Sequence, residues 1–305
     1  MELRVLHYFL AVAREQSISA AAESLHLSQP TLSTQLKAME EELGKQLLIR
    51  GTKGSRKVVL TEEGMILRKR AEEILSLVKR TEDEISRSDE VIVGDVYIGT
   101  GETDIVRFFA GAAKELQKKY PDIHYHISSG NAEYVLEYLD KGLIDFGLLF
   151  GTVDAQKYES LPLPIQDTWG VLMRRDSPLT QKARIGPEDL WDKPLIMSHQ
   201  RGDVSYLSRW MKKDLSTLNV VATYNLVYNA SLLVDEGLGY ALCLDKLINT
   251  TGSNLCFRPL DPPLEAAACI VWKKYQMFSK AAEAFLQSLH GMLEGTINPS
   301  PGVEK

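Results

Sequence analysis

Apolar residues recur at helical spacing through the first forty residues of the chain. Positions 3, 6, 9, 10 and 13 are apolar and predict an amphipathic helix that ends near residue 15. A short alanine-rich stretch at 18–25 predicts a second helix, which a serine can cap. Ser28 and Pro30 then open a third helix that buries Leu32, Leu36 and Met39 on one face.

The opposite face of this third helix carries short or amide side chains. Such side chains can meet base edges and phosphates at little entropic cost, as in a helix that lies in the major groove of DNA. Two helices joined by a tight turn also occur in generic helical packing units, so this segment leaves both readings open. The face consists of Gln29, Thr31, Ser33, Thr34, Gln35 and Lys37.

The residues after the third helix favour the DNA-binding reading. The helix ends at Gly44, a short strand runs to Arg50, a flexible loop covers 51–57, and apolar residues return at 58–60. This order predicts a winged helix-turn-helix. The loop region is also basic, because no acidic residue interrupts the cations Lys45, Arg50, Lys53, Arg56 and Lys57. We expect this stretch to contact phosphates, although charge runs often form only a solvated surface.

Formal charge is divided unevenly along the chain. The net charge is −6, yet residues 1–60 hold eight Lys/Arg against six Asp/Glu, and the remaining residues hold 27 against 35. The excess of positive charge therefore coincides with the predicted DNA-binding region.

The stretch from Phe9 to Gly64 resembles the hallmark of the LysR family of bacterial regulators. The resemblance implies that Gln29, Pro30, Ser33 and the basic wing lie at DNA, and we expect Ser28 at the start of the same helix to contact DNA as well. Two positions depart from the family pattern: Thr34 stands where arginine is usual, and Leu48 stands where phenylalanine is usual. The matching positions are Phe9-Leu10-Ala11-Val12-Ala13, Ser17, Ala21-Ala22, Leu25, Leu27-Ser28-Gln29-Pro30, Ser33, Gln35-Leu36-Lys37, Glu40, Leu43-Gly44, Leu47, Arg50 and Leu60-Thr61-Glu62-Glu63-Gly64.

A long helix is predicted from Thr61, its N-cap, to about Ser88. Its apolar positions are spaced alternately four and three residues apart, which is typical of a coiled-coil seam. This pattern favours a homodimer, which would bind an inverted repeat in DNA. The alternative is one helix packed on its own domain. The seam consists of Leu67, Ala71, Ile74, Val78, Thr81 and Ile85.

Strands alternate with helices after residue 90, which predicts an α/β region with a parallel sheet. Strands are expected at 93–99, 123–128 and 144–150, with helices at 103–119 and 131–141. A second set of strands is expected at 169–173, 194–197 and 240–244, and a last strand at 267–272 precedes a helix at 279–293. The chain is expected to pass between two lobes twice, near 162–168 and near 262–268. The segments 138–147 and 234–241 resemble the LysR effector domain, which is similar to a type 2 periplasmic binding protein.

The complete prediction is an α/β protein with three parts: a winged helix-turn-helix at 1–60, a linker and dimerisation helix at 61–90, and an effector domain at 91–298. Lobe I covers about 91–164 and 267–298, and lobe II about 165–266. The resemblance implies double-stranded DNA, a small-molecule co-inducer, a homodimer or homotetramer, and RNA polymerase as a further candidate partner. No cofactor is expected.

Ligands of open α/β lobes bind beyond the carboxyl ends of strands, often near helix N-termini. The same positions also serve ordinary turns and caps. A carboxylate at Glu102 that faced the cleft would disfavour a purely anionic effector. The candidates are Thr100, Gly101, Glu102, Thr103, Ser128, Ser129, Asn131, Phe150, Ser198, His199 and Gln200.

Other classes of protein fit the sequence less well. We expect a cytoplasmic protein without a membrane segment, because the chain opens directly on an amphipathic helix; a secreted solute-binding protein would need a signal peptide. A redox sensor remains an alternative, although Cys243, Cys256 and Cys269 lie in apolar runs. No catalytic motif is present, and His124 and His126 lack a third clustered ligand for a metal.

Overall fold

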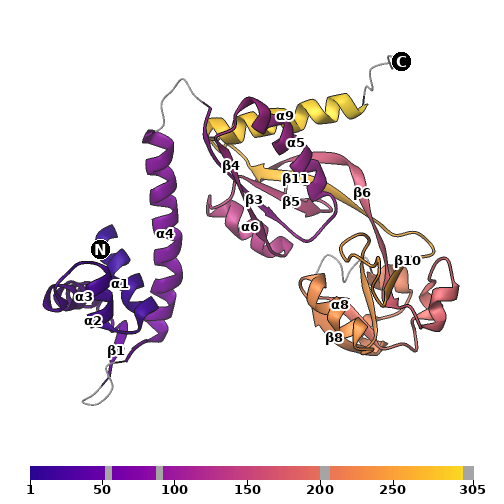
Figure 1. The fold of residues 1–305 in the computed structure, drawn as a ribbon, viewed down its shortest axis with the longest axis horizontal. Coiled ribbons are helices and arrows are strands. Elements are labelled where there is room, and N and C mark those ends of the chain that lie inside the picture. The colour runs from indigo at the N-terminus through magenta and orange to yellow at the C-terminus, as the bar shows by residue number, and fades with distance from the viewer. Residues whose placement is uncertain (52–56, 87–91, 200–206, 298–305) are drawn as a thin grey trace. The chain divides into compact units, whose positions relative to one another are not determined.

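The computed structural model describes residues 1–51, 57–86, 92–199 and 207–297 (Figure 1). The chain forms two compact units, Met1–Arg87 and Ser88–Lys305. Among the described residues, no helix combines the length and the apolar character needed to cross a membrane.

The first unit is a winged helix-turn-helix, as predicted. Its elements are α1 (Leu3–Glu15), α2 (Ile18–Ser24), α3 (Gln29–Leu43), β1 (Leu48–Arg50), β2 (Val58–Leu60) and α4 (Glu62–Ser86). Ser17 Oγ accepts a hydrogen bond from Ala20 N, and Ser28 Oγ accepts one from Thr31 N, so both predicted serine caps are present. Gly44 ends α3 with φ of +64°, a left-handed conformation that glycine adopts without strain.

A single apolar core holds this unit together. Phe9 of α1 and Leu32 and Leu36 of α3 are fully buried in it, and Leu48 and Val58 close it from the antiparallel pair β1–β2. Leu48 therefore fills a core position where the family pattern has phenylalanine, and the smaller side chain is accommodated without exposure.

The apolar stripe of α4 is shared between two roles. Ala71 is fully buried in the core of its own unit, and Leu67 and Ile74 pack against that core. The structure thus assigns the first half of the predicted seam to the chain's own fold, because α1 needs a covering helix. Further along, Val78 is half-buried and Ile85 is 80% exposed, so only the second half of the stripe is open to another chain.

The second unit is built on one mixed sheet with strand order β4-β3-β5-β11-β6-β9-β7-β8, and β10 pairs with β6. Helices α5 and α9 cover one face of the first strands and α6 covers the other (Figure 1). The strands and helices are β3 (Gly94–Thr100), α5 (Val106–Lys119), β4 (Ile123–Ser129), α6 (Ala132–Asp140), β5 (Phe146–Phe150), β6 (Tyr158–Arg174), β7 (Leu195–Ser198), β8 (Val220–Tyr224), α8 (Val227–Asp235), β9 (Tyr240–Leu244), β10 (Leu255–Pro259), β11 (Glu265–Lys273) and α9 (Lys280–Ile297), with short 3-10 helices at Pro178–Gln181, Pro187–Asp189 and Leu215–Thr217.

The strands β6 and β11 join the two lobes of this sheet. They run antiparallel to each other, from Thr168 opposite Glu265 to Tyr158 opposite Lys273. The strand expected at 169–173 is therefore the end of a 17-residue strand that includes the predicted crossing. Lobe I has a core around Phe109, Phe146 and Phe285, and lobe II has separate cores, one of which contains Trp169.

Candidate functional site

The first candidate site is the exposed face of α3. Gln29, Pro30, Thr34 and Lys37 are exposed and Ser33 is half-buried, whereas the opposite face is in the core. The cap at Ser28 also orders the start of this helix, because its hydroxyl lies 2.7 Å from that of Thr31. The structure therefore presents the predicted polar side chains on one accessible helical face.

Besides Ser28 and Thr31, two further predicted DNA-binding residues have partners within the protein. Thr34 donates a hydrogen bond of 2.9 Å from its hydroxyl to the carbonyl of Pro30. Arg50 lies 3.4 Å from Glu40, whose carboxylate also accepts the backbone N–H groups of Leu47 and Leu48. Glu40 thus anchors the start of the wing to α3, and Arg50 has a structural partner as well as partial exposure.

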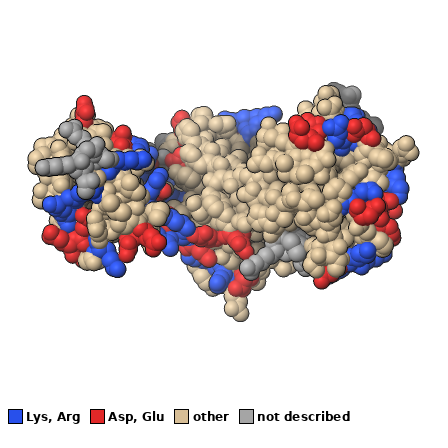
Figure 2. Space-filling view, turned by 90° about the horizontal axis from the view of Figure 1, so that it is seen from below, with Lys and Arg blue, Asp and Glu red and all other residues tan. Residues whose placement is uncertain are grey.

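The wing supplies the remaining predicted cations. Lys57 is exposed at the start of β2, and Lys53 and Arg56 lie outside the described residues. Figure 2 shows blue and red side chains intermixed over the first unit. On the face shown, charge does not mark out a basic patch, and the α3 face is defined by its exposed polar groups.

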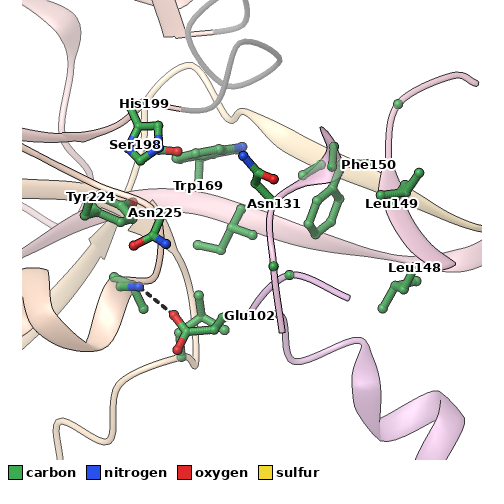
Figure 3. A pocket seen from close by; sticks show the side chains of 18 of the residues that line it. Glu102, Asn131, Leu148, Leu149, Phe150, Trp169, Ser198, His199, Tyr224 and Asn225 are labelled. Atoms are coloured by element: carbon green, nitrogen blue, oxygen red, sulfur yellow. Dashed lines mark hydrogen bonds between the residues drawn. The ribbon is translucent and has the colours of Figure 1, made fainter. Parts of the chain in front are cut away.

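The second candidate site is a cavity of about 490 Å³ in the second unit. This volume is typical of sites for small organic molecules. Residues of both lobes line it, as Figure 3 shows for the labelled side chains. The lining consists of Gly101, Glu102, Gly130, Asn131, Ala132, Glu133, Leu148, Leu149, Phe150, Gly151, Trp169, Ser198, His199, Tyr224, Asn225, Val227, Leu244, Leu247, Glu265, Ala266 and Ala267.

Six of the predicted effector-binding residues line this cavity. They come from the ends of four parallel strands, β3, β4, β5 and β7, as the rule for open sheets predicts, and they include the exposed His199. The amide oxygen of Asn131 accepts a hydrogen bond from Tyr134 N and caps α6, so its N–H groups are the part that can donate to a ligand. These six are Gly101, Glu102, Asn131, Phe150, Ser198 and His199.

Four other predicted residues lie outside the cavity lining. The hydroxyl of the buried Thr100 donates to the Gly101 carbonyl, and the hydroxyl of Thr103 donates to Asp167. Ser128 and Ser129 end the edge strand β4 and do not line the cavity. A local hydrogen bond thus accounts for Thr100 and a tertiary one for Thr103, and Gln200 lies outside the described residues.

Sequence reasoning missed several lining residues, two of them at or near the start of predicted strands and two near a strand that was not predicted. Trp169 belongs to β6, and Glu265 begins β11, both of which pass along the cavity instead of ending at it. Tyr224 ends β8 and Asn225 follows it, and this strand was not predicted from the sequence. The polar Asn225 before an apolar helical stretch was the only local signal for this part of the site.

Contacts near the cavity join the two lobes. Glu102 of lobe I accepts a hydrogen bond of 2.5 Å at Oε2 from the backbone N–H of Val227, the first residue of α8 in lobe II (Figure 3). Asp104 forms an ion pair of 3.7 Å with Lys246. The free N–H groups of a helix N-terminus attract anions, so Glu102 occupies a place that a ligand anion would otherwise take.

Asp167 is a buried carboxyl at the same junction. Thr103 donates a hydrogen bond of 2.5 Å to it, and the side chain is only 6% exposed. Burial raises the pKa of Asp167 above its usual range, against the opposing effect of the Thr103 hydrogen bond. An ionised Asp167 is thus costly in this position.

The cysteines and histidines form no reactive cluster among the described residues. Cys243, Cys256 and Cys269 are all buried free thiols, and burial raises the pKa of Cys243 to about 12. His126 stacks on Tyr97 and lies 2.9 Å from Asp95. In the described part of the chain, no group of three His, Cys, Asp or Glu side chains is arranged to hold a metal ion.

Two family models match nearly the whole chain. The model of the bacterial regulatory helix-turn-helix protein, lysR family, matches residues 3–65, and the LysR substrate binding domain matches residues 90–294. The first match lies within the first unit and the second within the second unit, and most of α4 lies between them.

Similar proteins include regulators from several bacteria. The uncharacterized HTH-type transcriptional regulator YvbU of Bacillus subtilis (strain 168) is 24% identical over 289 residues, which cover 94% of this chain and 97% of YvbU. The DNA-binding transcriptional dual regulator OxyR of Escherichia coli (strain K12) is 29% identical over 197 residues, or 65% of this chain and 63% of OxyR.

Solved structures share the fold. The crystal structure of CbnR, a LysR family transcriptional regulator, matches with a TM-score of 0.75 and 18% identity over 96% of this chain and 99% of CbnR. CbnR in complex with its target DNA matches equally well, with a TM-score of 0.75, 20% identity, and coverage of 95% of this chain and 99% of that one.

Proposed function

Because the chain belongs to the LysR family of transcriptional regulators, we propose that it binds an inverted-repeat operator as a homo-oligomer and that a small molecule in the cavity controls this binding. The protein is a DNA-binding regulator with an effector domain and not an enzyme. What is proposed here concerns its operator, its assembly, its site residues and its effector.

At the DNA, α3 is the element that we place in the major groove. Gln29 and Ser33 are proposed to contact base edges, and Ser28, Thr31, Thr34 and Lys37 to contact bases or phosphates around them. Lys57, together with Arg50, Lys53 and Arg56, is proposed to contact phosphates through the wing. The support is the exposed polar face of α3 next to the antiparallel wing.

A homodimer through the second half of α4 would place two such helices on one operator. The exposed Ile85 and the half-buried Val78 support this assembly. A two-fold protein reads half-sites of opposite orientation, about one helical turn or a multiple apart. The effector domains would add a tetramer interface, RNA polymerase would be a further partner, and the cytoplasm, where the DNA lies, would be the place of action.

The observation that carries the gating proposal is that both lobes line one cavity and touch each other at its edge through Glu102 and Val227. A ligand there would bind two lobes at once, and it would shift their geometry only through its difference in affinity between the two arrangements. That shift would change the spacing of the recognition helices and hence the bend of the operator.

The test begins with the full-length protein and a random duplex library, from which repeated selection should recover an inverted repeat. A metabolite library is then screened by thermal denaturation, because a ligand at 100 times its Kd should stabilise by about 2.7 kcal/mol. A hit should change the affinity or the footprint of the selected operator.

Ala267→Trp should abolish that response, because this residue lines the cavity and the larger side chain would fill part of it. Ala155→Trp, at an exposed position outside the lining, is the matched control. An equal response in both variants would place the sensing site elsewhere.

A further inference from the structure

The charges around the cavity indicate which kind of molecule it accepts. The described lining residues include three carboxylates, Glu102, Glu133 and Glu265, and neither lysine nor arginine. Each of the three comes from a different element: the loop after β3, the first turn of α6 and the start of β11. The cavity is thus negatively charged on several sides.

Two of these carboxylates, Glu102 and Glu265, have no cationic partner within the described part of the chain. Among the described residues, Glu102 has a single hydrogen bond, to the backbone of Val227. A ligand carboxylate would meet these groups in a partly water-excluded space, where repulsion between like charges is stronger than in water.

One of the helix N-termini at the cavity, that of α8, is already occupied by a carboxylate of the protein. The N-terminus of α8 points at the cavity edge, and its first N–H group donates to Glu102. An anionic ligand could use this helix end only by displacing the protein's own carboxylate. A cationic ligand would instead gain from Glu102 where it stands.

Aromatic and apolar side chains form another part of the wall. The ring of Trp169 lies between His199 and Asn131, with Phe150 and Tyr224 on either side of it (Figure 3). The face of an indole ring attracts cations within about 6 Å of its centroid, and leucines of β5 and β9 offer apolar contact for a ligand body.

We propose that the effector is an organic cation, an ammonium group attached to an aromatic or apolar body, with Glu102 as its main counter-ion and Trp169 as the ring on which it rests. This inference rests on the proposed function, since it names the class of molecule that the gating cavity takes. The cavity of about 490 Å³ sets the size of that molecule to a small metabolite.

The experiment compares molecules that share a body and differ in charge. Phenethylamine, 2-phenylethanol and phenylacetate form one set, and tryptamine, tryptophol and indole-3-acetate form a second. Binding of each to the full-length protein is measured by calorimetry. The amine should bind at least about tenfold more tightly than the alcohol, as expected for a hydrogen bond to a charged group, and the acid should bind most weakly.

The variant Glu102→Gln removes the negative charge of this side chain and keeps its size and shape. The amide oxygen of glutamine can still accept the Val227 N–H, so the junction between the lobes is kept while the charge is removed. Amine binding should fall roughly tenfold to a hundredfold, and alcohol binding should stay within about twofold. Glu236→Gln, at an exposed position outside the lining, is the matched control and should bind every probe as the wild type does.

Three outcomes would overturn the proposal: acids that bind more tightly than amines, alcohols that equal amines, or amine binding that is unchanged in Glu102→Gln. Absence of binding by every probe would overturn it as well. The proposed function is judged separately by the metabolite screen. An anionic hit that shifts operator affinity would leave the gating function standing and reject only the cationic class.

Discussion

Glu102 in lobe I accepts the backbone N–H of Val227 at the first residue of α8 in lobe II. One carboxylate therefore caps a helix that belongs to the other lobe and contributes to the negative charge of the cavity between them. The stability of the lobe junction and the choice of ligand are thus linked through a single side chain.

Removal of this carboxylate should destabilise the second unit. In Glu102→Ala the N–H of Val227 loses its acceptor, and loss of a helix cap costs about 0.5–2 kcal/mol. For a unit of this size the midpoint of thermal unfolding should fall by roughly 1–8 °C. Glu102→Gln should retain most of the stability, and differential scanning calorimetry of both variants checks this. Equal midpoints in Glu102→Ala and wild type would show that water replaces the contact without loss.

Substitution of Gln29 or Ser33 by alanine should weaken operator binding more than binding to random duplex. A side chain at a base edge contributes about 1–3 kcal/mol of discrimination between sequences. Lys57→Ala should behave differently: it should weaken both duplexes alike and reduce the slope of log affinity against log salt by about 0.9 if one phosphate contact is lost. Fluorescence anisotropy over a range of salt measures both effects. A Gln29→Ala protein that lost affinity equally for both duplexes would contradict the assignment of this residue to a base edge.

The divided stripe of α4 predicts different effects of a charge at its two ends. Ala71→Asp should unfold the first unit, because this residue is fully buried in the core. Val78→Asp and Ile85→Asp should leave the unit folded but separate the chains, because each charge would face its copy across a two-fold axis. Sedimentation and circular dichroism distinguish the two results. Ser76→Asp, an exposed position on the other side of the helix, is the control and should change neither property.

Asp167 should make the second unit less stable as the pH rises. Burial raises its native pKa above the ordinary aspartate value of 3.8, so the folded protein holds the proton more tightly than the unfolded chain does. Stability from this group is therefore greatest at low pH and is lost as the pH rises through the native pKa. Asp167→Asn stays neutral and keeps an acceptor for Thr103.

The unfolding midpoint of Asp167→Asn minus that of wild type should consequently grow between pH 4 and pH 7. The difference removes contributions from other groups, and the exposed Asp122→Asn should show no such trend. A midpoint difference that shrank with rising pH would mean that Thr103 and Lys246 stabilise the ionised form more than burial penalises it.

The thiols should react slowly in the native protein. With burial raising the pKa of Cys243 to about 12, only about 10⁻⁴ of this thiol is ionised at pH 8. Burial also raises the pKa of Cys269, and Cys256 is buried as well. Labelling by an aromatic disulfide should be slow until denaturant is added, after which all three thiols should react. Rapid modification of one native thiol would restore the redox-sensor alternative.

The first unit could be predicted from the sequence because its signals are local. Ser17 and Ser28 cap the helices that follow them, Gly44 ends α3, and the apolar positions of α1 and α3 keep a helical period. Each of these features depends on neighbours within a few residues along the chain.

The role of α4 was only partly predictable. Its period showed that one face is apolar, but a period does not identify the partner of that face. The structure places Ala71 against α1 and its neighbours, while Ile85 stays exposed. Which part of the apolar face is covered depends on packing against segments that are distant in the sequence.

By itself the sequence determined the helix-turn-helix, the alternation of strands and helices, and the positions of Gly101, Asn131 and Ser198 at strand ends. Only the tertiary structure decided that Trp169 and Glu265, about a hundred residues apart, complete the same cavity. It also removed Thr103 from the site by giving its hydroxyl to Asp167. The physical reason is that a cap or a period is set by adjacent residues, whereas a cavity wall is set by how β6 and β11 pair and by which side chains that pairing brings to face one another.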